Sequence, residues 1–136
     1  MAYLKAELSN SSKYHISKHR YYELKHYCMQ YKEWKDMLLR INEYPEYFVK
    51  LYTDYSQNES PTEHVAMMRA DLERNIKLIE QTALKCDDYL GKYILKAVTE
   101  DVSFITLQTI YDIPCGKDMY YDRYRKFFWM LSQFRS

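Results

Sequence analysis

The sequence predicts an all-α fold, built as a helical bundle or a helical arm with a C-terminal helix-turn-helix. The 136 residues include only two glycines and three prolines. β-Sandwiches and hairpin stacks need more positive-φ positions than two glycines supply, so we exclude these folds. Apolar residues recur three and four positions apart, as they do on one face of a helix. We expect one compact unit with three regions, residues 1–58, 59–86 and 87–136.

The N-terminal helical region is predicted to contain two helices and a shorter third. Ser17 is suited to cap a helix that runs to about Gln30, and a second helix covers residues 31–41. Pro45 marks the end of the second helix, because the residue before a proline avoids the α conformation. Residues 46–58 follow as a short helix and a loop.

The central region carries the clearest local helix signal. Ser60, Pro61 and Glu63 form a capping box with proline at the first helical position. We expect one long amphipathic helix from this cap to about Cys86. Its apolar stripe needs a partner helix, and the expected pairing residues are Val65, Met68, Leu72, Ile76 and Ile79. The N-terminal helices of the same chain are the favoured partner, and the same helix of a second chain, in a homodimer, is the alternative.

The C-terminal region has the layout of a helix-turn-helix module. Asp87 is suited to cap a helix over residues 89–98, and Ser103 is suited to cap another over residues 104–111. A short turn then leads into a long helix over residues 117–133. In such a module the short helix braces the longer one, whose N-terminal residues enter the major groove of DNA.

The turn and the start of the last helix define the expected DNA interface. We expect Ile113 to fill the core between the two helices, with Pro114 and Gly116 setting the turn. The expected DNA contacts are Lys117, Tyr120, Tyr121, Arg123, Arg125 and Lys126. The two arginines are the first candidates, because arginine donates two hydrogen bonds to guanine. The alternative interpretation is a plain helical bundle with solvated basic side chains.

Two runs of residues in this region carry a resemblance to a known family. They are Ser103-Phe104-x-x-Leu107-x-x-Ile110-Tyr111-Asp112-Ile113-Pro114 and Lys117-Asp118-Met119-Tyr120-Tyr121-x-Arg123-Tyr124-Arg125-Lys126-Phe127-Phe128. With these runs, residues 89–134 resemble the C-terminal helix-turn-helix of phage late-gene transcription regulators of the RinA and ArpU type. That module is in turn similar to the sigma-factor region that reads a promoter element. Sigma-like modules usually have glycine where this chain has Asp112.

The resemblance implies a function and a set of partners. The implied function is sequence-specific DNA binding in transcription control, in a protein of phage or mobile-element origin. The implied location is the cytoplasm of a bacterial host cell. The implied partners are double-stranded DNA and RNA polymerase or another host protein.

A second basic segment extends from Lys13 to Lys35. Six basic and two acidic side chains give this segment a net charge of +4. The residues that we expect as auxiliary phosphate contacts are Lys13, Lys18, Arg20 and Lys25. The alternative is an ordinary amphipathic helix with tyrosines at the edge of the core.

Catalytic, metal and membrane signals are weak in this sequence. His15, His19 and His26 have no carboxylate or cysteine at the spacing of a further metal ligand, and basic neighbours repel a cation. The three cysteines show no CxxC spacing. We therefore expect no enzyme activity, no cofactor and no metal site. The longest apolar runs are too short to span a bilayer, so we expect no membrane partner.

The charge balance keeps two rival functions open. The whole chain has a net charge of +1, and residues 87–136 hold seven basic and seven acidic side chains. DNA binding normally requires several net positive charges. The rivals are a phage DNA-packaging or assembly protein, and a small phage protein that inhibits a host protein by direct binding.

Overall fold

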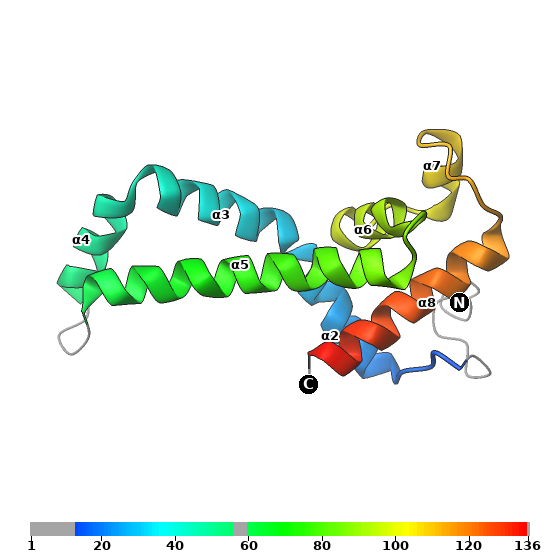
Figure 1. Ribbon diagram of the computed structural model, residues 1–136, viewed down its shortest axis with the longest axis horizontal. Helices are drawn as coiled ribbons and strands as arrows, with labels where there is room; N and C mark the ends of the chain where they lie inside the picture. The colour runs from blue at the N-terminus through cyan, green and yellow to red at the C-terminus, as the bar shows by residue number, and fades with distance from the viewer. Residues whose placement is uncertain (1–12, 56–59, 136) are drawn as a thin grey trace. The chain divides into compact units, whose positions relative to one another are not determined.

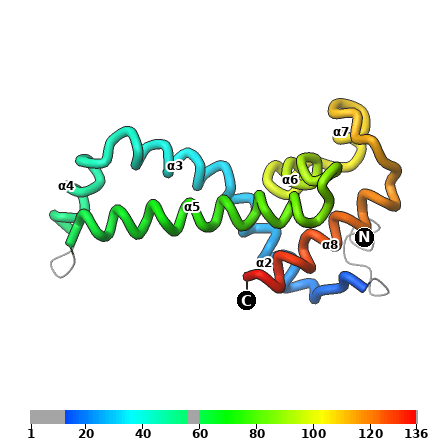
Figure 2. The backbone as a smooth tube through the Cα atoms, viewed as in Figure 1, coloured from blue at the N-terminus to red at the C-terminus, as the bar shows by residue number. Residues whose placement is uncertain are grey.

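The computed structural model describes residues 13–55 and 60–135, and these residues form seven α-helices and no strand (Figure 1). Figure 2 traces the same path as a smooth tube. The predicted all-α fold class is confirmed. Helices α2 to α8 match the predicted helices to within a few residues at most ends.

The described chain divides into two compact units that differ from the three expected regions. The terminal unit comprises residues 13–30 and 78–135, and the central unit comprises residues 31–55 and 60–77. Helix α5, Pro61–Cys86, begins in the central unit and ends in the terminal unit. The expected regions followed the order of the sequence, whereas the units follow contacts between helices that are distant in the sequence.

The terminal unit is built on α2, Lys18–Met29, together with the C-terminal helices α6, Gly91–Glu100, α7, Phe104–Thr109, and α8, Lys117–Phe134. Helix α2 packs against α6 and α8, and α6 also contacts α7 and α8. Ser17 caps α2 as predicted, because its Oγ accepts the Arg20 N–H at 3.2 Å. The largest fully buried side chains of this unit are Tyr21, Phe127, Phe128, Leu24, Ile79, Ile94, Leu107 and Leu131.

Tyr21 lies at the centre of this core. Its ring meets the edge of Phe128 with ring centroids 5.0 Å apart. Its hydroxyl forms a 2.7 Å hydrogen bond with the Tyr124 hydroxyl. Tyrosine suits this position because its apolar ring fills the core while its buried polar tip has a partner.

Gly91 allows α6 to begin close against the end of α5. A Cβ atom at this position would lie 2.8 Å from the Ala83 carbonyl oxygen. That contact is shorter than side-chain atoms tolerate, so a glycine is required by the close approach of two backbones. The two helices are thereby packed together within the terminal unit.

The central unit contains α3, Tyr31–Glu43, α4, Pro45–Tyr55, and the N-terminal part of α5. The break at Pro45 occurs as predicted, and α3 packs against α4. Ser60 Oγ accepts the Glu63 N–H at 3.4 Å, which confirms the predicted cap of α5. Contacts that connect α5 to the other helices of the unit include a 2.9 Å hydrogen bond from Arg69 to Asn42 and a contact between the rings of Tyr52 and His64.

The apolar stripe of α5 is largely used within the chain. Val65, Ile76 and Ile79 are buried, whereas Met68 and Leu72 are half-buried. Buried side chains are not available to a second copy. This finding favours the predicted intramolecular pairing over a homodimer formed through α5.

Candidate nucleic-acid interface

Helix α7 and the turn that follows it adopt a defined conformation. Ser103 caps the helix as predicted, because its Oγ accepts the Thr106 N–H at 3.2 Å. Ile113 is buried, and its N–H donates to the Leu107 carbonyl oxygen at 3.0 Å. The prediction that Ile113 fills the core is therefore confirmed. These contacts fix the path of the chain between α7 and α8.

Asp112 in this turn has left-handed backbone geometry, with a φ of 51°. Among amino acids, glycine adopts this region most readily, and aspartate and asparagine are the best tolerated alternatives. An aspartate thus carries the left-handed geometry of this turn.

The first turn of α8 is exposed, while one face of the helix forms core. Lys117, Asp118 and Met119 are exposed to solvent. Tyr120 is only 2% exposed and packs on Phe104 with ring centroids 5.1 Å apart. The expectation that Tyr120 contacts DNA is therefore wrong, because its side chain belongs to the core between α7 and α8.

Arg123, a first candidate for DNA contact, is engaged in ion pairs within the chain. Its Nε donates to Asp87 Oδ2 at 2.8 Å, and its Nη1 donates to Asp122. The hydrogen bond with Asp87 raises the pKa of Arg123 above its ordinary value. We correct its expected role, because its guanidinium ties α8 to the start of α6 and is not presented to a ligand.

Asp87 closes the turn before α6 through its other carboxylate oxygen. Asp87 Oδ1 accepts the N–H groups of Tyr89 and Leu90 at 2.9 and 2.8 Å. Partial burial raises the pKa of Asp87, but the hydrogen bonds from Leu90 and Arg123 outweigh this effect and leave it below the ordinary value. Helix α6 itself begins at Gly91 after Leu90, without a side-chain cap, so the expectation that Asp87 caps a helix from residue 89 is wrong. The connection of Asp87 to α8 has no local signal in the sequence.

The remaining predicted contacts on α8 lie on two flanks of the helix. Lys117, Tyr121 and Arg125 follow one another at intervals of four residues, so they lie along one flank. Lys117 is exposed, and Tyr121 and Arg125 are half-buried. Lys126 is also half-buried and lies on the other flank. The structure thus brings three of the six predicted residues onto one strip.

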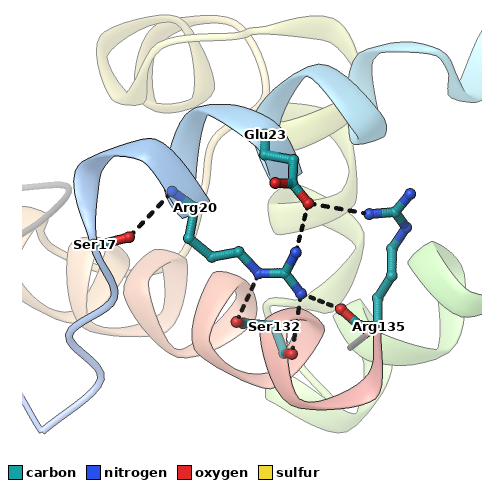
Figure 3. Close-up of polar contacts among 5 residues, drawn as sticks. All are labelled: Ser17, Arg20, Glu23, Ser132 and Arg135. Carbon is teal, nitrogen blue, oxygen red and sulfur yellow. Dashed lines mark hydrogen bonds and ion pairs between the residues drawn. The ribbon is translucent and has the colours of Figure 1, made fainter.

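Arg20 has a structural role in place of the expected phosphate contact (Figure 3). Its Nε donates to Ser132 Oγ at 3.0 Å, and its Nη2 donates to the carbonyl oxygens of Ser132 and Arg135. Its Nη1 pairs with Glu23 at 2.6 Å, and Glu23 also lies 3.5 Å from the Arg135 guanidinium. Carbonyl groups at a helix end lack partners within the helix, and Arg20 satisfies those at the end of α8.

The other three auxiliary residues differ in their availability. Lys25 Nζ lies 3.4 Å from Asp101 Oδ1, and its side chain is mostly covered. It is therefore also committed within the chain. Lys13 is exposed with its Nζ 5.0 Å from the centroid of the Tyr14 ring, and Lys18 is exposed. Of the four predicted contacts, Lys13 and Lys18 remain accessible.

Lys25 and Tyr121, predicted for separate surfaces, line the same pocket of the terminal unit. This pocket has a volume of about 410 Å³, and Asp101, Ser103, Phe104 and Tyr124 also line it. Asp101 has a φ of 54°, which ends α6 in a left-handed cap. The pocket connects the basic N-terminal segment to the flank of α8 that carries Tyr121.

Burial disfavours the thiolate, the nucleophilic form, at the cysteines that the structure describes. Burial raises the pKa of the Cys86 thiol to about 12, and this thiol donates to the Arg123 carbonyl oxygen at 3.0 Å. Burial also raises the pKa of the Cys115 thiol. Within the described residues, no cluster of three or more His, Cys, Asp or Glu side chains is arranged to hold a metal ion. The absence of enzyme activity stays a prediction.

Sequence reasoning missed an apolar element of this surface. Ile105 and Ile110 are 70% and 66% exposed, and Met119 is also exposed. The capping signal at Ser103 and the helical spacing of Phe104 and Leu107 already place Ile105 outside the buried face.

None of the helices in residues 13–55 and 60–135 is long and apolar enough to cross a membrane.

Comparisons with protein-family models, with curated proteins and with solved structures found no significant match to this chain in any of the three.

Proposed function

We propose that this protein binds double-stranded DNA sequence-specifically through α7 and α8, as a transcription regulator of phage or mobile-element origin. The observation that carries the proposal is that the first helical turn of α8 is exposed. It directly follows the connecting segment between α7 and α8, whose conformation is fixed. Asp112 and Ile113 fix that turn, and α6 packs against both helices of the module. A braced helix with an accessible N-terminus is what insertion into a major groove requires.

Burial and ion pairs change the set of side chains that this proposal assigns to DNA contact. Lys117, Tyr121 and Arg125 form the base-reading strip, and Lys126 contacts phosphate from the other flank. Tyr120 and Arg123 support the strip from within the fold. In protein–DNA complexes, the contacts that read base edges are generally distinct from the phosphate contacts that position the protein.

The net charge near the start of α8 supports DNA binding better than the zero net charge of residues 87–136 does. Arg123 is paired with Asp87 and Asp122, so these three side chains together carry a net charge of −1 and offer no positive charge to a ligand. Over residues 117–126, three other basic residues and Asp118 then remain, a net charge of +2. The exposed Lys13 and Lys18 supply two further positive charges. Together these side chains account for a modest, salt-sensitive affinity.

A selection of random duplexes over a salt series tests the proposal. We expect an enriched motif, with affinity that falls as salt rises. Lys117→Ala and Arg125→Ala should each weaken binding by about 1–3 kcal/mol where a base contact is lost. Lys92→Ala is the matched control, because Lys92 is exposed on α6 outside the strip. Absence of binding at low salt would refute the proposal.

A second candidate function is direct binding of a host protein. The specific observation is the exposure of Ile105 and Ile110 on α7 and at its end. Large exposed apolar side chains are typical of protein interaction sites. Under this candidate, Ile105→Lys abolishes host-protein binding, and Lys117→Ala leaves it unchanged.

A further inference from the structure

Helix α4 is rich in large apolar side chains, yet none of its residues is buried. Tyr47, Leu51 and Tyr55 are 63%, 47% and 86% exposed, and Tyr44 just before the helix is 59% exposed. We call these four residues the α4 face. Soluble proteins rarely leave such a contiguous apolar surface in water unless it binds a partner.

Two shallow apolar hollows follow the α4 face. One has a volume of about 530 Å³ and is lined by Met37, Arg40, Tyr44, Tyr47, Phe48 and Leu51. The other, of about 350 Å³, is lined by Leu51, Tyr52, Asp54 and Tyr55. Because Leu51 belongs to both, the hollows form a continuous surface along the helix.

We propose that the α4 face binds the α4 face of a second copy of this chain. The two helices run antiparallel about a two-fold axis at Leu51. In this register Tyr47 packs against the partner subunit's Tyr55, and Leu51 packs against the partner subunit's Leu51. A two-fold interface of this kind uses the same patch on both subunits.

The charges beside the α4 face are complementary in this register. At 100° per residue, Lys50 and Asp54 lie together on one flank of the face, and Glu46 lies further round the helix. Antiparallel pairing about Leu51 sets Lys50 on the same flank as the partner subunit's Asp54, offset by about 3 Å along the helix axis and within reach of the lysine side chain, and the symmetry repeats the pair. Neither Lys50 nor Asp54 forms an ion pair with a residue that the structure describes.

The exposed area also fits a second copy. The accessible parts of Tyr44, Tyr47 and Tyr55 together amount to about 400 Å². A stable interface buries roughly 800 Å² on each partner. Three side chains thus supply about half, and Leu51 with the walls of the hollows adds to it. With one lysine and two acidic residues, α4 lacks the basic excess that nucleic acid requires.

Sedimentation of the full chain over a concentration series tests this pairing. We expect a monomer–dimer equilibrium that Tyr47→Lys weakens at least about tenfold, because two lysines would then enter the apolar interface. Tyr89→Lys is the matched control, since Tyr89 is a tyrosine of the terminal unit that is exposed at least as much, 73% against 63% for Tyr47. Helical circular dichroism and melting temperature verify that both variants fold.

A charge exchange tests the register. Lys50→Asp and Asp54→Lys should each weaken the dimer about tenfold, because like charges then face each other. The double variant Lys50→Asp/Asp54→Lys should restore dimerisation. A chain that stays monomeric up to about 1 mM overturns the proposal. So does a failure of the double variant to recover, or an equal effect of Tyr89→Lys. No DNA enters these measurements, so their outcome is independent of the proposed DNA binding.

Discussion

Asp87 and Arg123 form a 2.8 Å ion pair that connects the start of α6 to the middle of α8. Both side chains are more than two-thirds covered. The Cys86 thiol strengthens the same junction through its hydrogen bond to the Arg123 carbonyl oxygen. These contacts therefore hold α8 against the junction between α5 and α6.

Replacing Arg123 tests whether it supports the fold or contacts DNA. We expect Arg123→Ala to lower the free energy of unfolding by about 1–3 kcal/mol, because it leaves the Asp87 carboxylate with one charged partner fewer. Urea unfolding of Arg123→Ala, Asp87→Asn and the double variant measures the coupling between the two side chains. Additive effects of the single variants would contradict the role that we assign to this pair.

The pH dependence of stability should report on Asp87. Its pKa is lower in the folded protein than in the unfolded chain. The stabilisation from its charged form is therefore present above about pH 4 and is lost as the pH falls through the folded-state pKa. Asp87→Asn should be less stable than the wild type at neutral pH, and the two should converge in acid. Parallel curves between pH 3 and pH 7 would exclude this contribution.

Substitution of the two glycines by alanine should change stability to different extents. Gly91→Ala places a Cβ atom against the Ala83 carbonyl group, and we expect it to cost about 1–3 kcal/mol. Gly116 has open space around it and a φ of −82°, so Gly116→Ala should change stability by less than about 1 kcal/mol. Thermal and urea unfolding compare the two variants. Equal effects would refute the close packing of α6 on α5.

Arg20 should affect stability more than an exposed lysine of the same helix. Arg20→Ala removes the donors that satisfy the carbonyl groups at the end of α8, and we expect a loss of about 1–3 kcal/mol. Lys18→Ala is the control and should stay within about 0.5 kcal/mol of the wild type. A role limited to phosphate contact predicts instead that Arg20→Ala weakens DNA binding without changing stability.

Local signals predicted the helices well because capping is a local interaction. Ser17, Ser60 and Ser103 each accept a backbone N–H three residues ahead, so the sequence alone identifies these helix starts. The units were not predictable in the same way. Their boundaries depend on which helices pack together, and α2 packs on helices near the other end of the chain.

The candidate site was only partly predictable, and the reasons differ between residues. Tyr120 shares helical spacing with Tyr124 and Phe127, so its burial was visible in the sequence. The roles of Arg20 and Arg123 were not, because their partners at Ser132 and Asp87 are remote in sequence. A basic side chain on a helix has the same sequence signature whether it caps a distant helix end or faces water.

The close approach at Gly91 and the left-handed backbone of Asp101 and Asp112 also constrain how this sequence can evolve. While α6 lies against Ala83, position 91 admits only glycine without rearrangement of the backbone. Positions 101 and 112 favour glycine, asparagine or aspartate, whatever their surroundings become. Most exposed positions carry no such restriction. Distant homologues of this chain should therefore have glycine at the position of Gly91, and glycine, asparagine or aspartate at the positions of Asp101 and Asp112.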